Sequence, residues 1–326
     1  MINHSISFIV IGKNEGLRIT KCMDSILYTV DINQISDYEI LYIDSKSTDD
    51  TLTRVQEFES VKVYFINGNT NAAIARNVGA KEAKKEILFF IDGDMEIIPE
   101  TLQLLYTPEK GLIHQFVSGD FEDHFYDKSG NFEGFKKRHN LKRDMYQNTT
   151  GGLFLITKEL WVQVGGMRNK FRIGEDFDLG LRLSKKSLKL LRIKEVLAKH
   201  HTISYNRNDR LWADVIKGDF LYYKSLLYRS HLSNKYIYKY LAREVTMFFF
   251  ILTLCVSIYL KNPMYLVLLV LIKLLYKRKK VKGNFWSLYA RYIIFDVGTF
   301  LGFFLFWPKS NKELDYVQLK VAEKQK

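Results

Sequence analysis

Apolar runs alternate with amphipathic segments along the first hundred residues, and no other feature restricts the possible folds as strongly. Runs of strand length occupy 5–12, 38–44, 61–67 and 86–92. Segments with helical periodicity separate them, at 14–30, 47–60 and 72–85. Strands that alternate with helices of this length form parallel βαβ units, and continuous apolar strands are typical of a sheet covered on both faces. We therefore predict an α/β fold with a mostly parallel, Rossmann-like sheet flanked by helices.

Polar clusters follow three of these strands, at Gly12–Glu15, Asp44–Ser47 and Asp92–Asp94. Ligands of such sheets bind beyond the carboxyl ends of the strands, so the three clusters predict one site. Gly93 separates the two aspartates, and two carboxylates on a short turn suit Mg²⁺ or Mn²⁺, which commonly lie between carboxylate and phosphate. Aspartates also form turns and cap helices, so the pair alone leaves a structural role open.

The composition changes near residue 240. Strongly apolar runs follow at 245–260, 263–275 and 292–307, and a basic run occupies 277–282. Each apolar run is shorter than a spanning helix or near its lower limit, so a buried helical subdomain is the alternative to membrane attachment. The basic run would lie in the cytoplasm beside anionic lipid. We predict one α/β domain over residues 1–240 and membrane-associated helices over residues 241–326.

The chain carries a formal net charge of +13, which favours an anionic partner such as a nucleotide, a nucleic acid or a membrane surface. Much of the excess lies beside the apolar C-terminal runs, so an anionic membrane explains it better than a nucleic acid. Cys22 and Cys255 are far apart in the sequence, which argues against a disulfide framework and fits a reducing compartment. The first residues form a strand pattern without a basic and apolar leader, so we expect no secretory signal.

Four motifs in a fixed order identify a resemblance to a known family. They are FIVIGKNEGLRITKCMDSIL, EILYIDSKSTDDT, AAIARNVGAKEAKKEILFFIDGDMEI and GGLFLITKELWVQVGGMRNKFRIGEDFDLGLRL. Over about residues 5–205 the chain resembles the family 2 glycosyltransferases, which have the GT-A fold. The resemblance implies a catalytic domain that moves a sugar from a nucleotide-diphosphate-sugar donor to an acceptor hydroxyl. It also implies an inverting reaction that depends on Mn²⁺ or Mg²⁺.

The resemblance assigns the donor side of the site to the ends of the first strands and to the helix before the fourth. Asp44 matches the aspartate that hydrogen-bonds the nucleotide base, although a strand-to-helix turn capped by Ser47 or Asp49 is a structural alternative. Arg76 matches a position that faces the donor, and its alternative is a surface ion pair with Glu82 or Glu86. The remaining donor-binding positions are Ile11, Lys13, Asn14, Glu15, Ser45, Asp92 and Gly93.

The metal position follows from the same resemblance. Asp94 would ligate the ion directly, and Asp92 would approach the ribose or the water shell of the metal. Many members of the family place a histidine after the acidic loop as a further metal or diphosphate contact. His200 and His201 both lie there, and we favour His200. Imidazole is an acceptable ligand for Mn²⁺.

The acid–base chemistry is assigned to the loop at 174–178. An inverting transfer needs one base that takes the proton of the acceptor hydroxyl. Asp176 matches the family's base, Glu175 would contact the acceptor or orient the loop, and Asp178 is the alternative base. Acids also favour a helix N-terminus, which is the structural explanation of this cluster. Gly151 and Gly152 match an acceptor-side loop in which small residues let the backbone approach the sugar.

The acceptor is predicted to be lipid-linked or a growing surface glycan, and the catalytic domain is expected at the cytoplasmic face of the cell membrane. The basic segment 135–148 is either an acceptor or headgroup contact or a solvated loop. A processive synthase would carry a QxxRW motif, of which Arg210 to Trp212 keep only a part. A nucleotidyltransferase would need a glycine-rich phosphate loop that IGKNEG lacks. A non-catalytic membrane-anchored scaffold is the third possibility, against which the intact Asp44, Asp94 and Asp176 count.

Overall fold

A computed structural model describes most of the chain as two compact units. The described residues are 5–107, 111–127, 129–203, 212–213, 215–268, 271, 285–309 and 313–319. One unit comprises residues 1–204 together with 310–326, and the other comprises residues 205–309. The boundary predicted near residue 240 therefore lies inside the second unit, and the end of the chain returns to the first.

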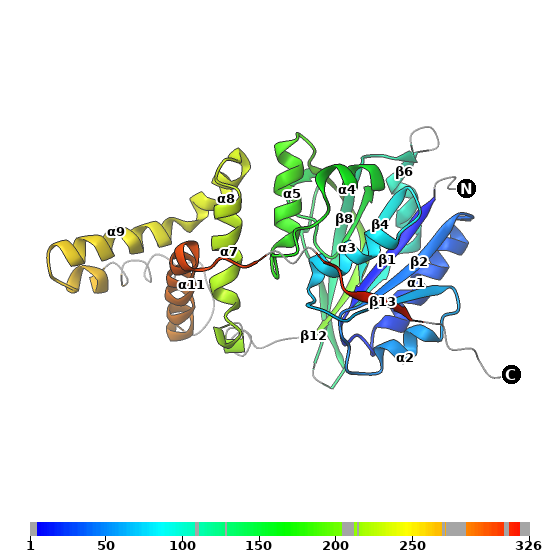
Figure 1. Cartoon of the computed structure of the whole chain (residues 1–326), viewed down its shortest axis with the longest axis horizontal. Helices are drawn as coiled ribbons and strands as arrows, with labels where there is room; N and C mark the ends of the chain where they lie inside the picture. Colours follow the sequence, from blue (N-terminus) through cyan, green and yellow to red (C-terminus); the bar gives the residue numbers. More distant parts are fainter. Residues whose placement is uncertain are drawn as a thin grey trace. The chain divides into compact units, whose positions relative to one another are not determined.

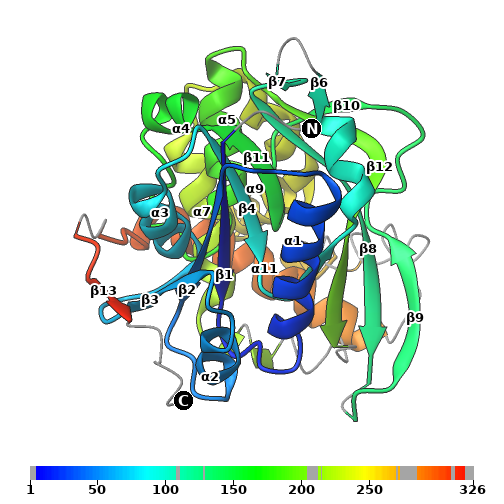
Figure 2. The same ribbon diagram turned by 90° about the vertical axis from the view of Figure 1, so that its right-hand side faces the viewer.

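The N-terminal half of the first unit has the predicted βαβ organisation. The strands β1 (Ile6–Gly12), β2 (Tyr38–Asp44), β3 (Val61–Ile66) and β4 (Ile87–Asp92) run parallel in the order β4-β1-β2-β3. The helices α1 (Ile19–Ile32), α2 (Thr51–Gln56) and α3 (Ala72–Glu82) connect them. Figure 2 shows α1 and α3 on opposite faces of the sheet. Each helix packs on its own apolar core, because alternate strand side chains point to opposite faces.

The complete sheet is mixed, so the prediction of a mostly parallel sheet was wrong. The order is β10-β12-β8-β11-β4-β1-β2-β3-β13. β11 (Leu153–Thr157) runs antiparallel to both β4 and β8 (Phe116–Tyr126), whereas β8 and β12 (Leu190–Ile203) are parallel. Parallel neighbours need a long crossover, usually a helix, and the strict strand–helix alternation ends after β4.

Smaller elements complete the first unit. They are β5 (Met95–Ile97), η1 (Pro99–Leu105), β6 (Tyr106–Thr107), β7 (Gly111–Leu112), β9 (Phe132–Lys137), β10 (Met145–Gln147), α4 (Lys158–Val164), α5 (Glu175–Lys185) and β13 (Tyr316–Leu319). β13 pairs antiparallel with β3 at one edge of the sheet, and β9 pairs with β8 (Figure 2). The hydroxyl of Tyr316 donates to Glu82 Oε1 at 2.5 Å, which ties this returning strand to α3.

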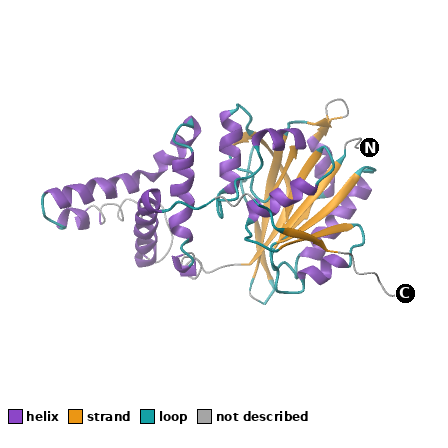
Figure 3. Cartoon of the chain, in the orientation of Figure 1, coloured by secondary structure: helices purple, strands orange, loops and turns teal. Residues whose placement is uncertain are grey.

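The described part of the second unit is helical (Figures 1 and 3). It contains α7 (Asp219–Ser230), η2 (Lys235–Ile237), α8 (Tyr238–Leu241), η3 (Ala242–Glu244), α9 (Val245–Tyr259) and α11 (Phe285–Leu305). Arg229 at the end of α7 donates to Phe303 O at 2.5 Å and lies 3.7 Å from the Trp307 ring centroid. None of the helices in the described ranges combines the length and the apolar character needed to cross a membrane. The basic run 277–282, most of 269–275, and Arg210 and Leu211 lie outside the described residues.

Candidate active site

The two aspartates that follow β4 lie on a turn fixed by neighbouring strands. The amide of Gly93 donates to Ile11 O at 2.8 Å, and the amide of Asp92 donates to Gly152 O at 3.0 Å. A Cβ atom on Gly152 would lie 2.9 Å from Asp92 Cγ and closer still to its Oδ2. The close approach of the Asp92 carboxylate therefore favours glycine at this position. The acceptor contact expected from the sequence stays a prediction.

Arg76 connects this turn to the acidic loop. Its guanidinium donates from Nη2 to Asp92 Oδ1 at 2.7 Å and from Nη1 to Glu175 Oε1 at 3.0 Å. The side chain is only 3% exposed, so the alternative of a surface ion pair with Glu82 or Glu86 was wrong. Burial raises the pKa of Glu175 to about 7, against the attraction of Arg76. Burial likewise raises the pKa of Asp92.

Asp94 and His200 form an acid–base pair at the position predicted for the metal. His200 Nε2 lies 3.2 Å from Asp94 Oδ2, and its Nδ1 lies 2.9 Å from Asp123 Oδ1. Although burial opposes the shift, the hydrogen bonds to Asp123 and Asp94 raise the pKa of His200 to about 9. His201 points instead to Glu96 and Tyr126, at 3.0 and 2.9 Å. The structure therefore brings His200, and not His201, to the side chain of Asp94.

The donor set at Asp94 fits a divalent ion that also binds a substrate. Asp94 Oδ1 is buried and has no hydrogen-bond partner among the described residues, which is the state expected of a ligand atom. No group of three or more His, Cys, Asp or Glu side chains in the described ranges could hold a metal alone. Mg²⁺ and similar ions are usually held by one or two carboxylates, waters and substrate phosphates, so two protein ligands are consistent with such a site.

The loops after β1 and β2 form one wall of the same edge. Asp44 is fully buried, and its Oδ1 accepts from the Ser47 amide at 2.8 Å. Ser45 N donates to Gly12 O at 2.9 Å, and Asn14 Oδ1 accepts from the Thr48 amide at 2.8 Å. Asp44 thus closes the turn after β2. Of the two residues predicted to cap the following helix, Asp49 accepts from the Thr51 amide at 3.1 Å at the start of α2 (Thr51–Gln56), whereas the Ser47 hydroxyl accepts from the Asn14 amide at 2.9 Å.

The other residues of the first loop differ in exposure. Ile11 is buried, whereas Lys13 and Asn14 are exposed. Burial, together with the charge of Asp94, raises the pKa of Glu15 to about 7. An ion pair of 2.7 Å between Glu15 and Arg18 opposes this shift. Glu15 is thereby an additional acidic group beside the Asp92–Asp94 turn.

The acidic loop begins α5 and separates its carboxylates into different environments. Gly174 adopts a left-handed conformation with φ of 82°, and the helix starts at Glu175. Asp176 is half-buried, and its Oδ2 accepts from Thr149 Oγ1 at 2.5 Å while its Oδ1 accepts from the Phe177 amide at 2.8 Å. Asp178 is fully buried between Arg168 and Arg182. Of the two proposed bases, Asp176 is the one that solvent and a substrate can reach.

Some residues at this edge were missed in the sequence. Asp123 and Thr149 lie outside the four sequence motifs. Arg138 belongs to the basic segment 135–148, for which the sequence predicts either a contact with the acceptor or a lipid headgroup, or a solvated loop. Arg138 donates to Asp123 Oδ1 through Nε at 3.0 Å. Several carboxylates within one strand-length segment, FVSGDFEDHFY, were the available signal for Asp123, since a buried carboxylate needs a partner.

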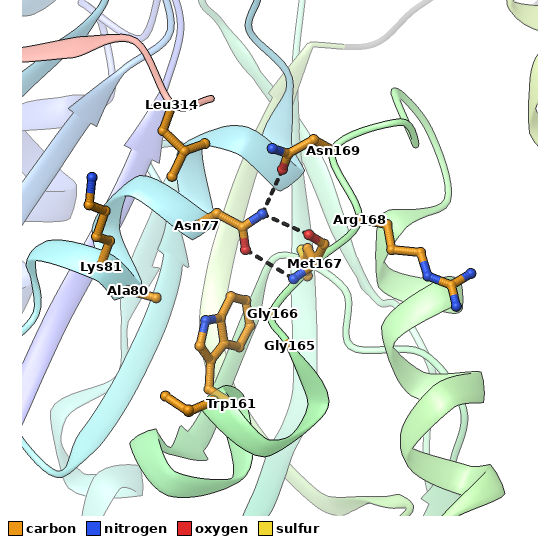
Figure 4. A pocket seen from close by; sticks show the side chains of 11 residues that line it. Asn77, Ala80, Lys81, Trp161, Gly165, Gly166, Met167, Arg168, Asn169 and Leu314 are labelled. Atoms are coloured by element: carbon orange, nitrogen blue, oxygen red, sulfur yellow. Dashed lines mark hydrogen bonds between the residues drawn. The ribbon is translucent and has the colours of Figure 1, made fainter. Parts of the chain in front are cut away.

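A shallow pocket lies between α3 and the loop that precedes α5 (Figure 4). Asn77 donates from Nδ2 to Met167 O at 2.7 Å and to Asn169 Oδ1 at 2.6 Å, and its Oδ1 accepts from the Met167 amide at 3.0 Å. Asn77, which follows Arg76 in the segment expected to face the donor, lines this pocket, whereas the residues predicted to bind the metal or act as the base do not. Asn77 fixes α3 against this loop, and this helps to position the adjacent Arg76.

Two family models match the chain. A model described as glycosyl transferase family 2 matches residues 7–168. A second, described as the N-terminal domain of galactosyltransferase, matches residues 136–206. Together they cover the four sequence motifs, the turn after β4 and the acidic loop.

Curated relatives carry related descriptions. An uncharacterised glycosyltransferase of Haemophilus influenzae is 27% identical over 190 residues, covering 55% of this chain and 61% of the relative. The poly(ribitol-phosphate) beta-N-acetylglucosaminyltransferase TarP of Staphylococcus aureus is 27% identical over 148 residues, covering 44% and 45%. A dolichyl N-acetyl-alpha-D-glucosaminyl phosphate 3-beta-D-2,3-diacetamido-2,3-dideoxy-beta-D-glucuronosyltransferase of Methanococcus voltae is 28% identical over 223 residues, covering 61% and 67%. The chain thus spans less than two thirds of the length of the first two relatives.

Solved structures show the same fold. GalNAc-T7, crystallised with UDP, GalNAc and Mn²⁺, aligns with a TM-score of 0.50 at 18% identity, covering 68% of this chain and 50% of that one. S. aureus TarS 1–349 in complex with UDP-GlcNAc aligns with a TM-score of 0.50 at 17% identity, covering 67% and 66%. At such identities the likeness establishes the fold.

Proposed function

The chain belongs to glycosyltransferase family 2, and from this premise we propose an inverting, metal-dependent sugar transfer at the edge formed by β1, β2, β4 and α5. The chain is a glycosyltransferase, rather than the nucleotidyltransferase or scaffold considered from the sequence. The bridge made by Arg76 between Asp92 and Glu175 is the observation that carries the proposal. It holds the predicted donor-side turn and the predicted acceptor-side loop at one site.

Residues on the donor side hold the diphosphate and prepare its departure. Asp94 and His200 would hold a Mn²⁺ or Mg²⁺ ion, which supplies positive charge to the leaving diphosphate. Because a metal ligand must be deprotonated, His200 would bind the ion as a neutral imidazole. Asp92, fixed by Arg76, would face the ribose or the water around the ion. The loops carrying Asn14 and Asp44 enclose the nucleotide.

Asp176 acts as the general base on the acceptor side. Each of its oxygens accepts one hydrogen bond and keeps a free lone pair, so one can take the proton of an acceptor hydroxyl. The acceptor oxygen then forms its bond to the anomeric carbon as the bond to the diphosphate breaks, and the negative charge leaves with the diphosphate. Glu175 is bound to Arg76 and orients the loop.

The relatives support a choice of substrates. Two of their names contain N-acetylated amino sugars, and the acceptors they name are a poly(ribitol-phosphate) and a dolichyl-linked sugar phosphate. We therefore place an N-acetylated nucleotide sugar first among donors and a lipid-linked sugar or surface glycan first among acceptors.

Attachment to the cytoplasmic face of an anionic cell membrane is part of the same proposal. The net charge of +13 and the exposed apolar side chains Phe248, Phe249, Leu252 and Ile258 on α9 support it. A helix that exposes such apolar side chains can bury them in the membrane interface without spanning the bilayer.

The proposal is tested with a panel of nucleotide sugars, each incubated with Mn²⁺ or with chelator and with or without membrane lipid extract. Nucleotide release and transferred sugar are measured, and the anomeric configuration of the product is read by NMR. We expect one donor to react, with inversion, only when metal is present. Retention of configuration, or transfer that is insensitive to chelator, would contradict the proposal.

A further inference from the structure

Arg192 on β12 is a buried cation with an unusual set of partners. It is fully buried, and within the described ranges no carboxylate lies at ion-pair distance from it. Its donors bind neutral oxygens instead: Gln147 Oε1 at 2.7 Å, Ser118 Oγ at 3.2 Å, Gly119 O at 2.5 Å, Thr149 O at 3.1 Å and Thr150 O at 2.8 Å. The charge of buried Asp120 attracts the guanidinium only from beyond ion-pair distance. Removing a charge from water is costly, so an apolar side chain would fill this space at lower cost.

The guanidinium of Arg192 joins two separate segments of backbone through these hydrogen bonds. Nη1 binds the β8 residues Ser118 and Gly119, while Nη2 binds the carbonyls of Thr149 and Thr150. A planar guanidinium has five donors in fixed directions, whereas a lysine ammonium has three on a flexible stem. Arg192 therefore links the backbone at 149–150 to the sheet, and no other side chain would reproduce the directions of these hydrogen bonds.

That backbone segment carries the hydroxyl that holds the proposed base. Thr149 Oγ1 donates to Asp176 Oδ2 at 2.5 Å, and the amide of Phe177 holds the other carboxylate oxygen. The threonine belongs to the loop before β11, and the aspartate belongs to α5. The hydrogen bond is thus a link between two separate elements, and its direction depends on where Arg192 places the loop.

We propose that Thr149 and Arg192 are positioning residues for catalysis: Arg192 fixes the Thr149 backbone, and the Thr149 hydroxyl sets the orientation of the Asp176 carboxylate. The inference rests on the proposed function, because it takes Asp176 as the base. Neither residue touches the reacting atoms. Their effect falls on turnover and not on donor binding, since the donor is held by residues after β1, β2 and β4.

The primary test replaces Thr149 by valine, which keeps the shape and removes the hydroxyl, and by serine, which keeps the hydroxyl. A hydrogen bond to a charged group is worth about 1.5–3 kcal/mol, so kcat of Thr149→Val should fall by about 10- to 100-fold. The KM for the donor should stay within about twofold, and Thr149→Ser should regain most of kcat. Thr29→Val is the matched control, because Thr29 is buried on α1 and donates only to Ser25 O at 2.6 Å.

A double-mutant cycle tests the role of Arg192. Arg192→Lys should lower kcat, and Thr149→Val should add little in its background, because both changes remove the same restraint. Additive effects would show that Arg192 acts elsewhere. If Arg192→Lys does not fold, the two Thr149 variants still decide the main point.

Two further outcomes would overturn the inference. Normal kcat in Thr149→Val, or a loss confined to the donor KM, would remove Thr149 from the positioning of the base. A crystal structure of Thr149→Val with an unmoved Asp176 carboxylate would do the same, whatever the activity. If the wild type transfers from no donor in the panel, the proposed function fails instead, and the crystal structure still decides the positioning.

Discussion

The contact between Gly152 and Asp92 offers a direct way to test how tightly the site is built. Replacing Gly152 by alanine would put a methyl group 2.9 Å from Asp92 Cγ and 2.7 Å from Met95 Cε. The end of a methionine side chain yields easily, because three torsions are free to adjust. The Asp92 carboxylate has less freedom, so it must turn away from the strand.

The size of the effect follows from the distances. The carboxylate needs to move by about 1 Å to restore an ordinary contact of 3.4 Å or more, and a misplacement of about 1 Å can lower turnover by about 100-fold. Such a shift breaks the 2.7 Å bond between Asp92 Oδ1 and Arg76. Over-packing costs about 1–3 kcal/mol of folding free energy, or about 2–4 °C in Tm per kcal/mol. Gly152→Ala should therefore lose far more activity than stability.

The assay compares Tm and transfer kinetics for the wild type, Gly152→Ala and Gly165→Ala. Gly165 is a suitable control because it has a φ of 76° and no described atom lies within 4 Å of the position of an added Cβ. Alanine in this left-handed backbone conformation costs about 1–2 kcal/mol and makes no new contact with Asp92. We expect a similar fall in Tm for both variants and a large fall in turnover for Gly152→Ala alone.

Wild-type turnover in Gly152→Ala would refute the argument that Asp92 must lie against Arg76 for the reaction. An equal loss of turnover in Gly165→Ala would refute it in another way, because a general loss of stability would then explain both variants. A crystal structure of Gly152→Ala that retains the bond between Asp92 and Arg76 would remove the structural basis of the prediction.

Three further predictions concern single carboxylates of the site. Asp176→Asn should bind the donor normally and lose about 10²- to 10⁴-fold in kcat, and turnover within tenfold of the wild type would place the base elsewhere. Asp94→Asn should lose the metal-dependent part of donor affinity, which calorimetry measures with Mn²⁺ and with chelator. An unchanged difference in donor affinity between the two conditions would show that Asp94 is not a metal ligand. Glu175 has its pKa raised from 4.5 to about 7, so the folded state favours its protonated form. Its contribution to stability is present below pH 4.5 and is lost as the pH rises through 7. In chelator, the Tm of the wild type relative to Glu175→Gln should therefore fall between pH 5 and pH 8, and a constant difference would contradict the shift.

Local sequence was sufficient for the N-terminal half of the sheet because its contacts are local. β1 to β4 follow one another with a helix between each pair, and parallel strands built in this way place their polar ends together. From the sequence alone, the same rule predicts that the loop after β1, the turn after β2 and the Asp92–Asp94 turn lie at one edge.

The pairing of the later strands could not be predicted because their partners are distant in the sequence. β8 pairs with β12, and β13 returns from the end of the chain to β3. Apolar periodicity does not reveal the partner or direction of a strand, so the antiparallel half of the sheet and the link from Asp123 to His200 could not be derived from it.

The alternative of a surface ion pair for Arg76 was wrong because the packing of its helix against the sheet decides whether this side chain is exposed. An arginine on a helix is ordinarily exposed, yet α3 has small residues around it, including Ala73, Ala75 and Gly79, all buried. An added Cβ on Gly79 would collide with Ile9 of β1, so the helix lies unusually close to the sheet. The run of alanine and glycine was the signal for this approach, since small residues let backbones pack closely, and it implied that Arg76 would be buried and in need of carboxylates.

The electrostatics of the site also bear on the meaning of the net charge of +13. The described edge is acidic, with Glu15, Asp92, Asp94, Glu175 and Asp176 near one another, and burial raises the pKa of three of these, Glu15, Asp92 and Glu175. In the proposed function, a nucleotide diphosphate would therefore be attracted there by a bound metal ion rather than by a general excess of cations. We therefore expect the positive charge of the sequence to act on an anionic partner other than the donor, and binding to anionic vesicles is to be measured separately from donor binding.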